Sequence, residues 1–191
     1  EDKDLYMFIS DSIFADGYIR SDNKGGESIA PLYIYSDDKV KTPNFNDDIW
    51  QKINDTVGET TPENILDYIY AVLHSPAYRQ SYGEFLKSDF PRVPYPSDKE
   101  TFWALVTLGT KLRELHLMTT SESEKFVTTY PIAGDNVVEK VRYEEGRVYI
   151  SDTQFFGGVT DSVWHFYIGG YRPAEKYLKD RKGRELTGEE I

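Results

Sequence analysis

Residues 61–75, TPENILDYIYAVLHS, carry the clearest structural signal in the chain, because they combine a helix start with a buried helical face. Thr61 is placed to cap a helix, with Pro62 at the first helical position and Asn64 at the third. Apolar residues then recur every three or four positions, at Ile65, Ile69, Val72 and Leu73. This spacing predicts an amphipathic helix whose apolar face packs on a core.

Two further helices are predicted beside this one. The segment 44–57 places its apolar residues four positions apart, as one helical face requires. The segment 75–91 repeats the start with Ser75 as the cap and Pro76 at the first helical position. That helix should stop before Pro91, since proline removes a backbone donor and restricts the residue before it.

A fourth helix is predicted over residues 97–118. Ser97 and Glu100 form a capping box at its start, and an amphipathic pattern follows. The proline-rich residues 90–96 before it must be extended. Three large apolar side chains of the chain are expected in the core: Trp103, Leu112 and Trp164.

Strand signals flank these helices. Residues 5–10 and 29–35 are short apolar runs separated by a polar, glycine-containing loop, and they are predicted to be strands. Residues 136–156 alternate polar and apolar side chains around a Glu-Glu-Gly turn, which indicates a β-hairpin. Two short helices are expected at 160–168 and 173–183.

The order of these elements predicts an α+β fold. A small mixed or antiparallel sheet with a central β-hairpin would pack with about five or six helices. The length of 191 residues fits a single domain over 1–191, of which 1–60 is the least distinctive part. The 15 tyrosines, 10 phenylalanines and 3 tryptophans can supply much of the buried apolar surface.

Composition excludes several kinds of site. The chain has no cysteine, so disulfides, zinc–thiolate sites and thiol nucleophiles are ruled out. The three histidines, at 74, 116 and 165, lie far apart in the sequence and are interpreted as scattered surface or core residues, with a metal or catalytic cluster assembled in space as the alternative. No phosphate-binding glycine loop and no Gly-x-Ser-x-Gly elbow occurs. We therefore predict no catalytic residue, no cofactor site and no metal site. No apolar run approaches the roughly 20 residues that span a membrane, and a cytoplasmic location is expected.

Charge is distributed unevenly along this acidic chain. The formal net charge is −11, yet residues 169–186 hold six cations and three anions, which leaves −14 on the rest. The six cations are Arg172, Lys176, Lys179, Arg181, Lys182 and Arg184. The first three follow helical spacing and share one face, and the others continue the charge beyond it. These six residues are called here the C-terminal strip. The charge pattern alone favours a solvated helix end, which complements the helix dipole and pairs with the acidic body, and a site for an acidic partner is the alternative.

Four segments of the chain resemble a known family. They are YIYAVLHSPAYRQSYGEFLKSDFPRVPYP (68–96), FWALVTLGTKLRELHLM (102–118), YPIAGDNVVEKVRYEEGRVYISDTQFFGGV (130–159) and VWHFYIGGYRPAEKYLKDRKGREL (163–186). Together they are similar to the C-terminal target-recognition, or specificity, domain of type ISP restriction–modification enzymes. These enzymes of bacterial defence carry nuclease, helicase-like ATPase, adenine-N6 methyltransferase and specificity modules in a single chain.

This resemblance implies that the chain is a C-terminal part of a longer protein and reads a sequence in double-stranded DNA without catalysis of its own. The methyltransferase domain of the same chain would be its second partner. S-adenosylmethionine, ATP and Mg would serve the parent enzyme, and none would bind this part. The alternative is an interdomain or protein-interaction module that docks by its basic C-terminal helix and never meets DNA.

Other basic residues join the C-terminal strip as candidates for DNA contact. Lys140, Arg142 and Arg147 belong to the predicted hairpin, and a two-stranded ribbon fits the major groove. Lys140 and Arg142 are two positions apart and should project from one strand face. Equally, these hairpin cations can pair with the neighbouring glutamates on a solvated surface. Candidates for backbone phosphate in the helical half are Arg79, Lys87 and Arg92.

Overall fold

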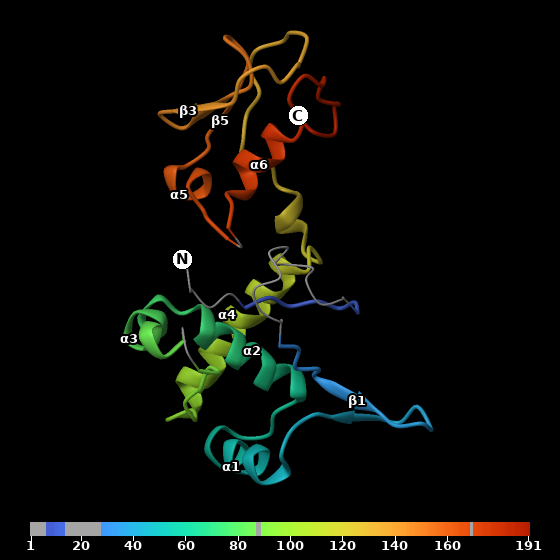
Figure 1. Ribbon diagram of the computed structural model, residues 1–191. Coiled ribbons are helices and arrows are strands. Elements are labelled where there is room, and N and C mark those ends of the chain that lie inside the picture. Colours follow the sequence, from blue (N-terminus) through green and yellow to red (C-terminus); the bar gives the residue numbers. More distant parts are fainter. Residues whose placement is uncertain (1–6, 14–27, 87–88, 169) are drawn as a thin grey trace. The chain divides into compact units, whose positions relative to one another are not determined.

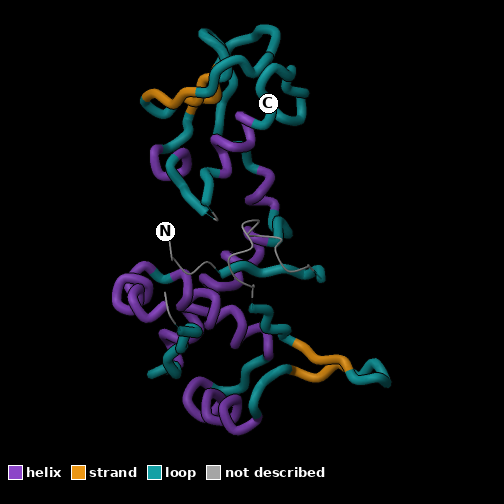
Figure 2. Tube along the Cα trace, viewed as in Figure 1, coloured by secondary structure: helices purple, strands orange, loops and turns teal. Residues whose placement is uncertain are grey.

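The computed structural model describes residues 7–13, 28–86, 89–168 and 170–191. Within these residues the elements are six α-helices, one 3-10 helix (Ser121–Glu124) and two antiparallel sheets, one of two strands and one of three (Figures 1 and 2). The predicted α+β fold is confirmed. The chain divides into two compact units, Glu1–Ser123 and Glu124–Ile191.

Helices α2 (Pro62–His74) and α4 (Lys99–His116) form the centre of the first unit. Helix α1 (Asp47–Val57) packs against α4, and α3 (Pro76–Leu86) packs against α2. All four were predicted, with α3 ending before the proline as expected. Their buried side chains form one cluster, made of Ile53, Val57, Ile65, Tyr68, Val72, Leu73, Tyr78, Phe102 and Val106.

Side-chain caps fix where these helices begin. The Thr61 hydroxyl accepts from the backbone N–H of Asn64, and the Asn64 side chain accepts from the backbone N–H of Thr61, so the predicted start of α2 is confirmed with both bonds of a capping box. The predicted cap of α4 was wrong by one residue. Asp98 is the cap and accepts from the N–H of Thr101 at 2.7 Å, while Ser97 donates its hydroxyl to the Asp98 carboxylate.

Residues 90–96 form neither helix nor strand, and two buried tyrosines fix them in place. The Tyr68 hydroxyl donates to the carbonyl of Pro94 at 3.0 Å, and the Tyr78 hydroxyl donates to that of Arg92 at 2.8 Å. Trp103 and Leu112, predicted to be core residues, are half-buried. Trp103 packs against the buried cluster and donates its indole N–H to the carbonyl of Val57.

The strands of the first unit differ from the sequence prediction. Strand β1 (Tyr33–Tyr35) covers only the end of the predicted strand 29–35, and it pairs with an unpredicted strand, β2 (Lys41–Pro43). Residues 7–10 are not a strand, and the rest of the predicted strand 5–10 lies outside the described residues. A short turn between β1 and β2 makes a local hairpin, which extends away from the helices of this unit in Figure 1.

The second unit is built on strands β3 (Arg142–Glu144), β4 (Arg147–Tyr149) and β5 (Phe155–Gly157), in that order across the sheet. The predicted hairpin is confirmed by β3 and β4. Its turn residues Glu145 and Gly146 both have positive φ, 46° and 79°, as a type I′ turn requires. Strand β5 was not predicted.

Two short helices complete this unit. Helix α5 spans Asp161–Trp164 and α6 spans Pro173–Lys179, so both end before the predicted limits of 168 and 183. Trp164 is buried as predicted and stacks on Tyr143, with ring centroids 5.6 Å apart. The buried core of the unit is made of Val138, Val148, Ile150, Val159, Trp164, Leu178 and Leu186.

No helix in the described part of the chain is both long enough and apolar enough to cross a membrane. Within the same residues, no group of three or more potential ligand side chains is placed to hold a metal ion.

Candidate nucleic-acid interface

The C-terminal strip is only partly helical. Arg172 is the N-cap residue of α6, and Lys176 and Lys179 lie on the helix, as the spacing predicted. Arg181, Lys182 and Arg184 lie beyond the helix end, in the turns that follow. The strip therefore divides into a helical part and a C-terminal part, and their side chains have different partners.

The helical cations pair with carboxylates of the same helix and its cap. The Lys176 Nζ is 2.7 Å from Asp180, the Lys179 Nζ is 2.7 Å from Glu175, and an Arg172 Nη1 is 3.8 Å from Glu175. The three basic side chains are 42% to 59% exposed. Exposed pairs of this kind contribute about 0.3–0.5 kcal/mol, so an incoming anion can replace the carboxylate at little cost.

The C-terminal cations instead surround Glu190. Its carboxylate accepts from the backbone N–H of Thr187 at 2.9 Å, from the Arg181 Nε at 2.8 Å and from an Arg184 Nη2. These hydrogen bonds hold the pKa of the Glu190 carboxyl far below its usual range, and the bond from Thr187 makes the largest contribution. The Arg181 guanidinium also lies 3.4 Å from the centre of the Tyr177 ring. Arg181 and Arg184 thus stabilise the C-terminal turn.

A hollow lies along the helical part of the strip. Its walls come from Tyr167, Gly170 and Tyr171 on one stretch of chain, and from Arg172, Glu175, Lys176, Lys179 and Asp180 around α6. Tyr171 is exposed by 42%. A concave surface with exposed ammonium and guanidinium groups beside aromatic rings matches the chemistry of a sugar–phosphate chain.

The three-stranded sheet has one core face and one outward face. Strand pairing aligns Arg142, Tyr149 and Phe155 in one row across the outward face, and aligns Glu144, Arg147 and Gly157 in the next. The Arg142 guanidinium lies 4.0 Å from the Tyr149 ring centre, and that of Arg147 lies 5.1 Å from the Phe155 ring centre. The Tyr149 and Phe155 rings are themselves 5.2 Å apart. Two arginines and two aromatic rings therefore form one continuous layer, called here the arginine–aromatic face.

Lys140 does not belong to this layer by strand register. It precedes β3, and the backbone N–H groups of Glu139 and Lys140 both donate to the carbonyl of Ile150, the pattern of a β-bulge. The bulge lies before Val141, so it does not separate Lys140 from Arg142, and their position on one strand face stays a prediction. The pairing with glutamates, left open by the sequence, is present for Arg142, whose Nε is 3.2 Å from Glu144.

The basic candidates of the first unit lie apart from these surfaces in sequence and belong to the helical half. Arg79 is half-buried on α3. The Arg92 side chain is 89% exposed and bonds to Asp89 at 3.2 Å. Lys87 lies outside the described residues.

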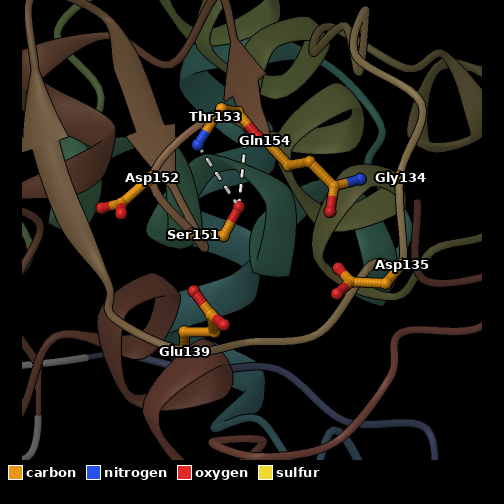
Figure 3. Close-up of a pocket in the computed structure, with 7 residues that line it drawn as sticks. All are labelled: Gly134, Asp135, Glu139, Ser151, Asp152, Thr153 and Gln154. Carbon is orange, nitrogen blue, oxygen red and sulfur yellow. Dashed lines mark hydrogen bonds between the residues drawn. The ribbon is translucent and has the colours of Figure 1, made fainter.

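An acidic hollow lies at one end of the sheet, lined by Gly134, Asp135, Glu139, Ser151, Asp152, Thr153 and Gln154. Figure 3 shows the Ser151 hydroxyl between Asp152 on one side and Asp135 on the other. That hydroxyl accepts from the backbone N–H groups of Thr153 and Gln154, which closes a tight turn. Three carboxylates make this hollow unsuitable for phosphate.

Two buried polar groups of the first unit were missed by the sequence reasoning. Asp67, 2% exposed, accepts from Arg113 through Nε at 2.6 Å and Nη2 at 3.1 Å. Farther along α2, the Tyr70 hydroxyl is 2.6 Å from the Nδ1 atom of His116, and the ring of His74 is 5.6 Å from that of His116. Only the spacing of polar residues on the inner faces of α2 and α4 could have indicated these contacts.

The histidine interpretation thus needs correction, since His74 and His116 meet in space. Burial and the neighbouring His74 lower the pKa of His116, and burial raises the pKa of Tyr70 to about 12. The lowered pKa favours the neutral form of the His116 ring, and the Tyr70 hydroxyl remains protonated at neutral pH. These groups are suited to holding α2 against α4 rather than to proton transfer.

Comparison with solved structures gives the fold a clear set of relatives. The chain is similar to part of a DrdV–DNA complex, with a TM-score of 0.61 and 24% identity over 78% of this chain and 16% of that one. It is also similar to part of LlaBIII, an ATP-dependent Type ISP restriction–modification enzyme bound to DNA (TM-score 0.56, 18% identity, 78% of this chain and 10% of that one). A nuclease-deletion mutant of the Type ISP enzyme LlaGI, in complex with a DNA substrate mimic, gives a TM-score of 0.51 and 21% identity. This similarity covers 80% of this chain and 11% of that one.

The chain therefore spans only about a tenth to a sixth of the length of these structures. A search of curated proteins finds no match. The family model of the Type ISP C-terminal specificity domain matches all of residues 1–191. The similar folds and this match over the whole chain lead to one conclusion: the chain belongs to the family of Type ISP C-terminal specificity domains.

Proposed function

We propose that this chain is the target-recognition module of a Type ISP restriction–modification enzyme and selects the DNA sequence on which the rest of that enzyme acts. The observation that carries the proposal is the family match over residues 1–191. The similar folds of LlaBIII and LlaGI support it, because both were solved with DNA or a DNA mimic. Duplex DNA is accordingly the partner.

Backbone phosphates are assigned to the hollow along α6. Arg172, Lys176 and Lys179 line it, and their present partners are carboxylates one turn away. Exchanging such a carboxylate for a phosphate keeps each cation paired and releases a counterion from the DNA. Lys182 extends the same strip beyond the helix, and no ion pair to it is found among the described residues.

The remaining candidates have smaller parts in this proposal. Arg181 and Arg184 already hold Glu190, so they support the turn and do not face DNA. Arg79 and Arg92 supply additional phosphate contacts from the helical half, and Arg92 is the more exposed of the two. Lys140 contributes from the bulge before β3.

This module performs no catalysis itself in our proposal. The parent enzyme supplies methylation and cleavage from other modules, with S-adenosylmethionine, ATP and Mg bound there, and it works on DNA in the cytoplasm. The neighbouring methyltransferase module of the same chain is the second partner. Its contact with this chain orients the recognised sequence relative to the methylation site.

The second candidate function is docking between modules through the C-terminal strip. It is favoured by the paired state of the cations, since three of them already face carboxylates as they would in a protein interface. Docking and DNA binding make different predictions for sequence selection, because a docking surface has no base to read.

The test is selection of duplexes from a random-sequence pool by the full-length protein, followed by sequencing of the bound fraction. We expect a short, defined sequence to be enriched, and we expect this enrichment to be lost when residues 1–191 are removed. Enrichment that survives the removal would show that sequence selection lies in another module, and the proposal would then be wrong.

A further inference from the structure

Arg142 differs from the three helical cations of the C-terminal strip in how it is held. Its guanidinium lies over the Tyr149 ring at 4.0 Å, its Nε is 3.2 Å from Glu144, and its Nη1 is 3.8 Å from Asp152. The Nε atom is buried and makes no hydrogen bond, while the side chain as a whole is 32% exposed. The exposed part of the side chain therefore lies on atoms other than Nε, a set that includes the two Nη atoms.

A guanidinium fixed in this way suits a contact that demands precise placement. An arginine side chain loses about 2 kcal/mol of rotamer freedom when it is immobilised, and a residue already held by a ring and a carboxylate avoids most of that loss on binding. The Nη1–Nη2 edge of a guanidinium carries two parallel donors, which match the O6 and N7 acceptors of guanine.

The local charge balance argues against a phosphate beside Arg142, because two carboxylates face this one guanidinium, whereas three cations share two carboxylates along α6. Glu144 and Asp152 both lie within 4 Å of the guanidinium group, and the Asp152 side chain is 95% exposed. A phosphate brought to the Arg142 edge would meet that exposed negative charge, so the site disfavours the DNA backbone and favours a neutral group. A base edge is such a group.

A G·C pair presents the complementary pattern in the major groove. Guanine offers two acceptors, and the cytosine N4 amino group offers a donor beside them, which aspartate and glutamate accept. Two donors on Arg142 next to an acceptor on Asp152 match this order of groups. An A·T pair presents a different order, with an amino donor where guanine has O6, and it would face the arginine with a donor.

We propose that Arg142 and Asp152 together read one G·C base pair in the major groove, with Arg142 on guanine and Asp152 on cytosine. Tyr149 and Glu144 are positioning residues that hold the guanidinium. This assignment rests on the proposed function, since it names the base contact of a DNA-reading module. It also accounts for acidic residues on a DNA-facing surface, because one of them accepts a hydrogen bond from a base.

The test compares Arg142→Lys, Asp152→Asn and Lys176→Gln in the full-length protein by the same random-duplex selection, with binding titrations on the enriched sequence. Arg142→Lys keeps the charge and removes the two parallel donors. We expect both variants at the sheet to relax the preference at one and the same G·C position by about 5- to 140-fold, and to leave the other positions unchanged. Lys176→Gln should weaken binding to all duplexes alike.

Three outcomes distinguish a failure of this assignment from a failure of the proposed function on which it rests. A wild-type protein that enriches no sequence would contradict the proposed function, and this assignment with it. An enriched sequence that keeps full preference in both sheet variants would overturn the assignment alone. Relaxation at two different base pairs would show that Arg142 and Asp152 do not share one pair. Asp152→Asn replaces an exposed side chain, so it remains informative if Arg142→Lys lowers stability.

Discussion

Gly109 determines how closely α2 and α4 approach. A Cβ atom at this buried position would lie 1.9 Å from the carbonyl oxygen of Asp67, far inside any real contact. The close approach lets Thr110 and Arg113 reach the Asp67 carboxylate, at 2.7 Å and 2.6 Å. A buried carboxylate is tolerated only when such partners satisfy it. The absence of a side chain at Gly109 thus permits the buried ion pair between Asp67 and Arg113.

We expect Gly109→Ala to destabilise the protein, because the added Cβ would push the backbone of α4 away from that of α2. Overpacking of a core costs about 1–3 kcal/mol, and separation of the Asp67 carboxylate from Arg113 would add to that loss of stability. Urea unfolding followed by circular dichroism measures the difference. The matched control is Gly83→Ala on α3, where nothing lies within 4 Å of the added Cβ, and a gain of about 0.5–1 kcal/mol is expected. Equal stability of the two variants would contradict this account of Gly109.

Contacts between residues close in sequence could be predicted, whereas contacts between residues far apart in sequence could not. Thr61 was predicted as the cap of α2 with Asn64 three positions further on, and the two residues form a capping box. Asp67 and Arg113 are 46 positions apart, as are Tyr70 and His116, and no local pattern links them. Likewise, the sequence named Arg142 as a candidate, but the ring beneath it became visible only through the pairing of β3 with β4.

Among the elements, those with their own caps or turn residues were predicted, and element limits that depend on pairing with another segment were not. The β3–β4 hairpin has its own turn residues, and α2 has its own cap and apolar stripe. Helix α6 ends early because the chain after it pairs with an earlier segment. The Gly183 N–H donates to the carbonyl of Val138 at 2.7 Å, and the Val138 N–H donates to that of Arg184 at 3.1 Å. Nothing in the sequence of residues 173–183 encodes that partner.

Glu190 gives the C-terminal turn a defined dependence on pH. Its folded pKa is lowered from the ordinary value of 4.5, so its contribution to stability is present above pH 4.5 and is lost as the pH falls through the lowered folded value. We expect Glu190→Gln to lower the melting temperature at pH 7, and to reduce the loss of stability as the pH falls below 4.5. Differential scanning calorimetry across this range measures both.

The neighbouring exposed residue provides the control for this prediction. Glu189→Gln removes the same charge one position earlier, where the side chain is exposed. We expect it to leave the melting temperature and its acid dependence close to those of the unmodified protein. A Glu189 variant that loses as much stability as the Glu190 variant would show that net charge, and not the turn, is responsible.

For the chain as a whole, the acidic charge and the proposed DNA contact must be reconciled. A net charge of −11 repels a duplex at long range, so attraction has to be local, and salt should weaken it strongly. Two features supply local complementarity: exposed cations that can exchange their carboxylates along α6, and a carboxylate that can accept from a base at the sheet. Each belongs to the second unit.

We expect the double variant Lys176→Gln, Lys179→Gln to bind selected and unselected duplexes more weakly by nearly the same factor. Removing one lysine–phosphate interaction should reduce the slope of log affinity against log salt by about 0.9, so the slope should fall by about 1.8 for the pair. Fluorescence anisotropy at increasing salt measures it on the full-length protein.

Lys99→Gln with Lys111→Gln on α4 is the matched control for this double variant, because it removes the same charge from the first unit. We expect it to leave the salt slope nearly unchanged. An unchanged slope in the Lys176 and Lys179 variant, together with weaker binding to the methyltransferase module, would favour interdomain docking.

Exchange of this domain between two enzymes tests most directly whether residues 1–191 select the DNA target. Residues 1–191 would replace the corresponding domain of a second Type ISP enzyme with a different target, and methylated positions would be mapped across a genome that carries the hybrid. We expect the hybrid to methylate the sequence of the enzyme from which residues 1–191 came. Methylation at the second enzyme's original sequence would contradict the assignment of target recognition to this chain.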